Sequence, residues 1–288
     1  MIGELRIDRD RHGSPTVFTE PGQEPDWRRP VCLLLHGYNV SPPAANSAYM
    51  RLFDTIRCQT GLPPFLQSRS WLVCWPAYAS WGLARGKTIF SPLTYSLQIP
   101  SAVEAAQALK RYIDRVNSDR PEITLLAHSL GCRVALELLD SYAMTSRTAA
   151  PQFPVVVLMA AAIPTYFFDD LVRLWRGALL PRQTMVFFSA RDPVLTGPFR
   201  VGQTIAREGV FPKAVGATGR PLLGFWTHVV PTRNRHSGYF SDPTTAAHIA
   251  QSFGQAAPKY LPSLDETFAK LQQPRTLPEL VLDSRSPL

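Results

Sequence analysis

The stretch that decides the fold of this chain is residues 123–140, which read ITLLAHSLGCRVALELLD. The short apolar run from Ile123 to Ala127 is typical of a buried strand, and the apolar positions after Gly131 follow the period of a helix. Ser129 stands at the sharp turn between the two. Such a turn lifts the serine hydroxyl above the edge of a sheet and points the first N–H groups of the helix at the space in front of it. The pattern predicts a nucleophile at Ser129.

Small residues are needed on both sides of this serine, because strand, turn and helix pass close together. Gly131 meets that need, and Ala127 stands where the motif prefers glycine, one methyl group larger. An ordinary strand–turn–helix with an incidental serine is the alternative, since matches this short occur by chance. The strand and helix patterns on either side favour the nucleophile.

Strands and helices alternate along the rest of the chain. Apolar runs without polar alternation predict buried strands of a parallel sheet, at 31–35, 71–75, 123–127, 153–163, 184–188 and 225–230. Helical patterns lie between these runs, at 41–56, 101–116 (opened by a Ser101–Glu104 capping box), 168–176, 199–208 and 244–253. Weak alternation over 4–20 predicts an antiparallel hairpin or two edge strands. The fold class is α/β, with a mostly parallel sheet, helices on both faces and no large cap domain.

The domain boundaries follow from the same patterns. We expect one domain over 1–254, with its core in 31–254 and N-terminal edge strands in 1–30. Residues 255–288 are proline-rich, and we expect a tail there with one short helix near 264–271.

Composition excludes several classes of protein. The 288 residues are 45% hydrophobic and 18% charged, as in ordinary globular proteins. The net charge of +8 is spread over scattered arginines, which argues against nucleic-acid binding and leaves a mild preference for anionic substrates or surfaces. The start lacks the apolar core of a signal peptide, and the longest apolar run, 155–163, is too short to span a bilayer.

The four cysteines make no C-x-x-C pair and no zinc-like spacing with histidine. We interpret them as reduced thiols of a cytoplasmic protein, and we expect no metal and no cofactor.

Four motifs together resemble the α/β-hydrolase superfamily. They are His36-Gly-Tyr-Asn at a strand end, Ala-His-Ser129-Leu-Gly, Asp192-Pro after a later strand, and the late His236-Ser-Gly-Tyr-Phe. The resemblance covers about residues 31–254 and implies an α/β-hydrolase fold. The His-Gly-Tyr-Asn opening is similar to that of a bacterial branch of largely uncharacterised hydrolases.

The resemblance also implies roles. Ser129, Asp192 and His236 occur in the order that the fold requires, as nucleophile, acid and base. The family pattern places the oxyanion hole at the backbone N–H groups of Leu130 and Tyr38. Asn39, beside Tyr38, is expected to brace that loop or to add a donor.

Each of these roles has a competitor. Asp169 or Asp170 is the alternative acid, because some family members carry it one strand earlier. His228 is the alternative base, although it lies inside a predicted strand, where a hydrogen-bonded core histidine is more common. We expect His36 to brace its own loop, and His128 to fill a variable position.

Two aromatic segments, 76–100 and 164–181, should border the site, since loops at the carboxyl ends of strands form the pocket in such sheets. The predicted substrate-binding residues in them are Trp81, Phe90, Tyr166 and Phe167. Plain core packing is the alternative for these side chains. Basic residues are also expected near the mouth, where they would favour an anionic ester or lie in solvent: Arg85, Lys87, Arg191, Arg233 and Arg235.

The expected activity is cleavage of carboxylic esters, with an apolar acyl part, by a serine hydrolase working through an acyl-enzyme. A thioesterase, an amidase or an acyltransferase would use the same residues. A non-catalytic hydrolase-fold scaffold, with the tail binding a partner, is the alternative from another class. The sequence does not indicate an oligomeric state.

Overall fold

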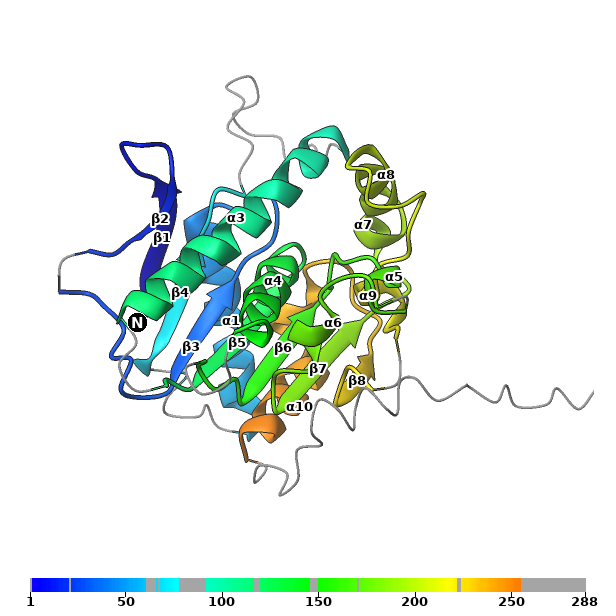
Figure 1. The fold of residues 1–288 in the computed structure, drawn as a ribbon. Helices are drawn as coiled ribbons and strands as arrows, with labels where there is room; N and C mark the ends of the chain where they lie inside the picture. The colour runs from blue at the N-terminus through cyan, green and yellow to red at the C-terminus, as the bar shows by residue number, and fades with distance from the viewer. Residues whose placement is uncertain are drawn as a thin grey trace, which may run out of the picture. The chain divides into compact units, whose positions relative to one another are not determined.

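The computed structural model describes residues 2–254 except 21, 61–65, 67, 78–91, 117–119, 146–149, 170 and 222–223. At its centre lies one eight-stranded sheet with the strand order β2-β1-β4-β3-β5-β6-β7-β8 (Figure 1). The strands are β1 (Gly3–Arg9), β2 (Pro15–Phe18), β3 (Val31–Leu35), β4 (Ser70–Cys74), β5 (Ile123–His128), β6 (Val155–Met159), β7 (Gln183–Phe188) and β8 (His228–Pro231). β1 and β2 form the predicted antiparallel hairpin at the edge, and every other neighbouring pair is parallel.

Helices cover both faces of this sheet (Figure 1). They are α1 (Pro42–Thr60), α3 (Pro92–Val116), α4 (Gly131–Ala143), α5 (Tyr166–Asp169), α6 (Trp175–Ala178), α7 (Pro193–Thr196), α8 (Pro198–Ile205), α9 (Val215–Thr218), the 3-10 turn η1 (Gly238–Ser241) and α10 (Pro243–Gly254). α1 packs against α10 on one face, and α4 packs between α3 and α6 on the other. The predicted α/β architecture is confirmed.

The central strands carry the core. β3, β5 and β6 are buried along their whole length, as their unalternating apolar sequences predict. Because parallel strands end at a common edge, the turn after β5 and the loops after β3, β7 and β8 meet there. This edge holds the motifs that the sequence singles out.

The predicted capping box at Ser101 is wrong. α3 begins at Pro92 and runs through Pro100, so Ser101 lies inside the helix. Two side chains of the added turns, Tyr95 and Ile99, are buried. Packing of this segment extends the helix past a proline that the sequence pattern would place at its start.

The helix predicted over 168–176 is also wrong. The chain forms two separate turns, α5 and α6, because Leu171 and Leu174 adopt left-handed backbone angles, with φ of 51° and 62°. This break lets the Arg173 side chain reach Glu137 on α4, at 2.7 Å. An interaction distant in sequence has overridden the local helical pattern.

Two predicted strands are shorter than expected. The strand predicted over 153–163 ends at Met159, where Ala160 turns the chain out of the sheet with a φ of 49°. The strand predicted over 225–230 begins only at His228, since Trp226 packs its ring against Phe168 instead of pairing.

In the part of the chain that the structure describes, no helix is both long and apolar enough to cross a bilayer. The predicted tail over 255–288 and its domain boundary lie at or beyond the end of that part.

Candidate active site

Ser129 lies at the turn between β5 and α4, with a φ of 55°. This left-handed angle is costly for a residue with a side chain, so the surrounding structure must hold it. The Ser129 N–H donates to the carbonyl of Met159 at 2.9 Å, and the Ser129 carbonyl accepts from the Ala162 N–H at 3.2 Å. Both partners belong to β6 or its continuation. The neighbouring strand therefore fixes the strained turn.

The close packing of this turn explains the need for glycine. A Cβ atom on Gly131 would lie 2.2 Å from the Leu35 carbonyl oxygen, and one on Gly37 would lie 2.8 Å from Ser129 Cβ. Real Cβ atoms do not approach so closely, and a backbone carbonyl cannot swing aside as a side chain can. The small residue expected at Gly131 is therefore a steric requirement of the turn.

Ser129, His236 and Asp192 are brought together by three different loops. His236 Nε2 lies 2.9 Å from Ser129 Oγ, and His236 Nδ1 lies 2.8 Å from Asp192 Oδ2. The carboxylate can only accept, so Nδ1 carries a proton and Nε2 is free to accept from the serine hydroxyl. Asp192 rather than Asp169 bonds to this histidine, and His236 rather than His228 reaches Ser129. The other alternative acid, Asp170, lies outside the described residues.

Asp192 is fully buried and is the N-cap of α7. Its Oδ1 accepts the N–H groups of Val194 at 2.9 Å and Leu195 at 3.3 Å, which leaves Oδ2 for His236. The local Asp-Pro sequence thus does two things. It starts the helix, and it aims the second carboxylate oxygen at the imidazole.

The loop that carries His236 is held by contacts distant in sequence. The Thr232 N–H donates to the Phe188 carbonyl at 2.8 Å, and Asn234 Nδ2 donates to Asp242 at 3.1 Å. The shortest of these hydrogen bonds comes from His128, whose Nε2 lies 2.7 Å from the His236 carbonyl oxygen. A carbonyl only accepts, so His128 donates its Nε2 proton there.

His128 is a site residue that the sequence analysis missed. Its side chain is buried against the rings of His236 and Phe240, with centroids 5.0 and 4.9 Å away. Burial, with a smaller contribution from His236, lowers the pKa of His128 to about 3. His128 is therefore neutral at ordinary pH. No local signal distinguishes it, because its role depends on a carbonyl 108 residues away in the chain.

The His-Gly-Tyr-Asn loop follows β3 and is braced from both ends. His36 stacks on Trp75, whose indole Nε1 donates to the His36 carbonyl at 3.0 Å. Asn39 adopts a φ of 56°, and its N–H donates to the Ala77 carbonyl at 2.9 Å. Burial lowers the pKa of His36, which keeps it neutral as a structural group. The expectation that His36 braces its loop is confirmed.

The two predicted oxyanion-hole residues flank Ser129. Leu130 follows it directly at the N-cap of α4, and no acceptor in the described chain takes its N–H. Tyr38 belongs to the loop whose Gly37 touches Ser129. The Tyr38 side chain bonds to Thr94 on α3, so α3 holds this loop against the turn.

A buried charge cluster lies one helical turn beyond the serine. Arg133 on α4 donates to both carboxylate oxygens of Glu208 at 3.0 and 3.1 Å and to Glu137 at 2.7 Å. Arg173 donates to the same two acids. Burial opposes the charge on Arg133, but the two carboxylates outweigh it and raise its pKa. The cluster ties α4 to the segment after α8.

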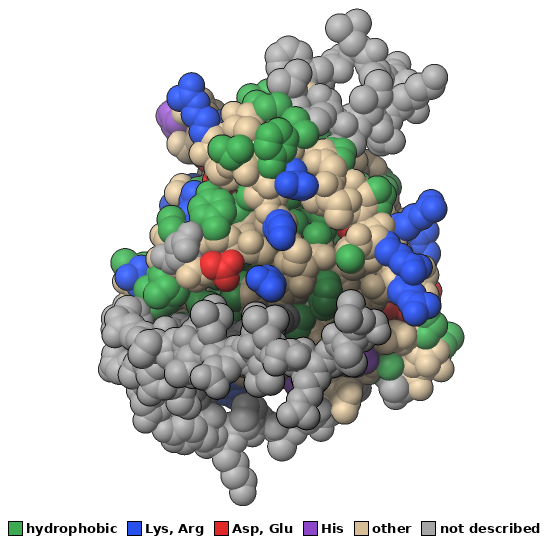
Figure 2. Space-filling model, turned by 90° about the vertical axis from the view of Figure 1, so that its right-hand side faces the viewer, with side chains coloured by type: hydrophobic (Ala, Val, Ile, Leu, Met, Phe, Trp, Pro, Cys, Tyr) green, Lys and Arg blue, Asp and Glu red, His purple; other side chains and the backbone are tan. Residues whose placement is uncertain are grey.

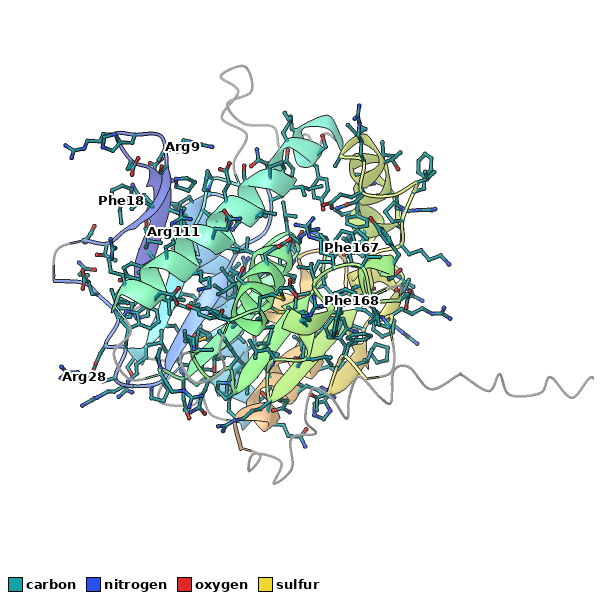
Figure 3. The ribbon with its side chains drawn as sticks, viewed as in Figure 1. Arg9, Phe18, Arg28, Arg111, Phe167 and Phe168 are labelled. Carbon is teal, nitrogen blue, oxygen red and sulfur yellow. The ribbon has the colours of Figure 1, made fainter. Side chains whose placement is uncertain are left out.

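The predicted substrate-binding residues fall in two groups. Trp81 and Phe90, with the basic Arg85 and Lys87, lie outside the described residues. Tyr166 and Phe167 lie on α5, with ring centroids 4.8 Å apart. Phe167 is buried beneath the Arg133 guanidinium, 4.9 Å from the ring centroid, and Figure 3 labels it on the α4 side of the sheet. Its ring thus contacts Tyr166 and both arginines of the charge cluster.

Comparison with protein families identifies the chain. Residues 23–251 match the family described as alpha/beta hydrolase of unknown function (DUF900), and the chain belongs to that family. The eight-stranded sheet and the turn at Ser129 are therefore those of an α/β hydrolase.

Solved structures of similar fold share little sequence with this chain. TT1662 from Thermus thermophilus is 14% identical, with 87% of this chain and 97% of that chain covered and a TM-score of 0.42. Carboxyl esterase 2 from the fungus Tuber melanosporum is 12% identical, with 80% and 79% covered and a TM-score of 0.37. Esterase B from Lactobacillus rhamnosis is 11% identical, with 81% and 77% covered and a TM-score of 0.38. At these values the likenesses carry no conclusion about activity. No curated protein matches the chain significantly.

Proposed function

We propose that this chain is a serine hydrolase that cleaves carboxylic esters through an acyl-enzyme. The observation that carries the proposal is the continuous hydrogen-bonded chain from Ser129 Oγ to His236, 2.9 Å, and from His236 to Asp192, 2.8 Å. A serine hydroxyl is a weak nucleophile until a base accepts its proton in the step that forms the new bond. This geometry supplies that base.

In the acylation step, Ser129 Oγ attacks the ester carbonyl carbon while its proton passes to His236 Nε2. The imidazolium then gives that proton to the leaving alkoxide, and the alcohol departs. Water repeats the sequence on the acyl-enzyme and releases the carboxylic acid. Asp192 holds the tautomer with the proton on Nδ1 and stabilises the positive charge that His236 carries between the two transfers.

The negative oxygen of the tetrahedral intermediate needs donors already in place. We assign this role to the backbone N–H groups of Leu130 and Tyr38. The Leu130 N–H is unused by the described protein and stands at the start of α4, where the helix dipole favours negative charge. The acyl part of the substrate is proposed to be apolar, with Trp81, Phe90 and Tyr166 as its binding residues. Phe167, buried beneath Arg133, fits the core-packing alternative instead.

Labelling with a fluorophosphonate tests the nucleophile. Such a probe reacts with a serine that a base and an oxyanion pocket have activated. Intact-mass analysis of the wild type should find a single adduct that is absent from Ser129→Ala. Ser47→Ala is the matched control, because Ser47 is an exposed serine that only bonds the Pro43 carbonyl. Loss of the adduct in this control, or no adduct on folded wild type, would contradict the proposal.

A series of activated esters and thioesters with increasing acyl length then tests the substrate class. The proposal expects ester turnover to rise with chain length until the pocket is filled. Faster turnover of thioesters or amides of the same acyl group would overturn the ester assignment. It would leave the nucleophile in place.

A further inference from the structure

One stretch of the surface is unusually apolar. Of the nine large hydrophobic side chains that are exposed in the described chain, four lie within residues 201–211. They are Val201, Ile205, Val210 and Phe211, and we call them the α8 surface. Val210 is 83% exposed and Phe211 is 50% exposed. Monomeric proteins rarely display such side chains together unless the surface binds something.

Hydrogen bonds to α8 hold the loop that carries two of these side chains, Val210 and Phe211. The Phe211 N–H donates to Thr204 Oγ1 at 2.8 Å, and Arg200 Nε donates to the Phe211 carbonyl at 3.1 Å. Both partners belong to α8, so the loop is fastened along the helix. Val201 and Ile205 are four residues apart and therefore share one side of α8. The four apolar side chains therefore lie on α8 and on the loop that is hydrogen-bonded to it.

The charged residues of the segment that carries the α8 surface are mainly basic. Arg200, Arg207 and Lys213 are its basic residues, and the only acid between 197 and 213 is Glu208. Glu208 is turned inward, where Arg133 binds both of its oxygens. Neither Arg207 nor Lys213 has an ion-pair partner among the described residues. Arg133 and Arg173 thus balance the charge of Glu208, and Glu104 of α3, which lines the same groove as Ile205, is paired with Arg9.

The position of the α8 surface relates it to the candidate active site. α8 follows α7, whose N-cap is Asp192, so the surface lies beyond the carboxyl end of β7. Ile205 also lines a groove of about 630 Å³ with Leu97 of α3, which is itself 57% exposed. Figure 2 faces the side of the molecule on which α8 lies. Hydrophobic and basic side chains are prominent there, and acidic ones are sparse.

We propose that the α8 surface docks the protein on a lipid bilayer that contains anionic phospholipid. Exposed aliphatic and aromatic side chains that flank a short helix can enter the headgroup region, while neighbouring cations bind lipid phosphates. The interleaving of Val210 and Phe211 with Arg207 and Lys213 fits this occupant. A flat lipid surface satisfies both kinds of side chain without a matched partner shape.

Flotation with lipid vesicles tests this proposal on the full chain carrying Ser129→Ala, so that binding is read without turnover. Vesicles of phosphatidylcholine with phosphatidylglycerol should carry the protein upward, and vesicles of phosphatidylcholine alone should carry much less. Replacing both apolar tips, Val210→Ser with Phe211→Ser, should lower binding about tenfold or more. Arg207→Glu with Lys213→Glu should lower it about tenfold and abolish its salt dependence.

The control pair is Met144→Ser and Arg28→Glu. Met144 is 66% exposed just past the end of α4. Arg28 precedes β3 and lies on the far side of the molecule from α8 (Figures 1 and 3). These variants should bind vesicles like the parent. Equal binding by the α8-surface variants would overturn the proposal. So would a wild-type dimer that Phe211→Ser makes monomeric and that ignores vesicles, because the surface would then join two copies of the chain.

The vesicle result is independent of the proposed activity. A protein that binds vesicles but takes no fluorophosphonate keeps the docking surface and loses the hydrolase mechanism. A protein that is labelled but does not bind vesicles gives the reverse outcome.

Discussion

The turn at Ser129 and the loop at His236 meet in one site but are held in different ways. The turn is fixed by backbone packing, with Gly131 against the Leu35 carbonyl and the Ser129 N–H on the Met159 carbonyl. The His236 loop is fixed mainly by side chains, above all by the hydrogen bond from His128 to the His236 carbonyl. Backbone packing tolerates little change, whereas a side-chain contact can be weakened in steps. The two halves of the site should therefore respond differently to substitution.

The largest effect is expected at Asp192, the buried acid that bonds His236. Asn would keep the cap of α7, because its oxygen can still accept the N–H groups of Val194 and Leu195. It cannot stabilise the imidazolium, and it favours the wrong tautomer of His236. We expect Asp192→Asn to lower kcat for an activated ester about 10⁴-fold, with little change in thermal stability.

Asp169→Asn is the matched control for this prediction, since Asp169 is one of the two acids that the sequence offered as alternatives. It should retain kcat. A loss of activity at Asp169 equal to that at Asp192 would mean that the acid is misassigned.

The next effect concerns the turn at Ser129, which backbone packing holds in place. In Gly131→Ala the new Cβ would lie 2.2 Å from the Leu35 carbonyl, so β3 or α4 must shift. We expect a loss of about 3 kcal/mol in the free energy of unfolding, measured by urea denaturation. Gly197→Ala is the control, because its Cβ would lie 3.2 Å from the nearest atom. Similar stability of the two variants would show that the turn can relax.

A third effect concerns the stability of the protein at low pH, and it depends on His128, which holds the His236 loop. The pKa of His128 falls from 6.5 to about 3 on folding. Between these two pH values the unfolded chain therefore binds a proton at His128 and the folded chain does not. Stability should therefore decrease as the pH falls below the unfolded pKa. The contribution of His128 between pH 7 and pH 5 is about 2 kcal/mol. Chemical denaturation across this range measures it.

His128→Gln removes the titrating group and keeps a donor for the His236 carbonyl. The variant should lose less stability than the wild type over the same range of pH. An identical pH dependence in both proteins would mean that His128 is not the group responsible.

The smallest effect is on kcat, and it tests how His128 holds the His236 loop. His128→Phe fills the space but cannot bond the His236 carbonyl, so the His236 loop gains freedom. We expect kcat to fall about tenfold with KM nearly unchanged, because the base is displaced while the acyl pocket is not. His128→Gln should restore most of the rate. Equal loss in both variants would point to packing rather than to the hydrogen bond.

Sequence patterns predicted most of the fold because they are local. The buried runs of β3 and β5 predict a parallel sheet, and the glycine that ends the Ser129 motif predicts a tight turn, both without reference to distant residues. The motifs also pointed to Ser129, Asp192 and His236, with His236 preferred to His228 because it follows the predicted strand rather than lying inside it. The errors lie where distant contacts override local preference, as in the break between α5 and α6 that lets Arg173 reach Glu137.

The sequence by itself determined the class of fold, because periodicity and turn residues are properties of short segments, and it pointed to Ser129, Asp192 and His236 as candidates. Only the tertiary structure decided which groups touch. It set the 2.8 and 2.9 Å distances at His236, gave His128 its hydrogen bond, and paired Glu208 with Arg133. The physical reason is that these contacts join residues far apart in the chain. Their strength comes from burial, which no local pattern records.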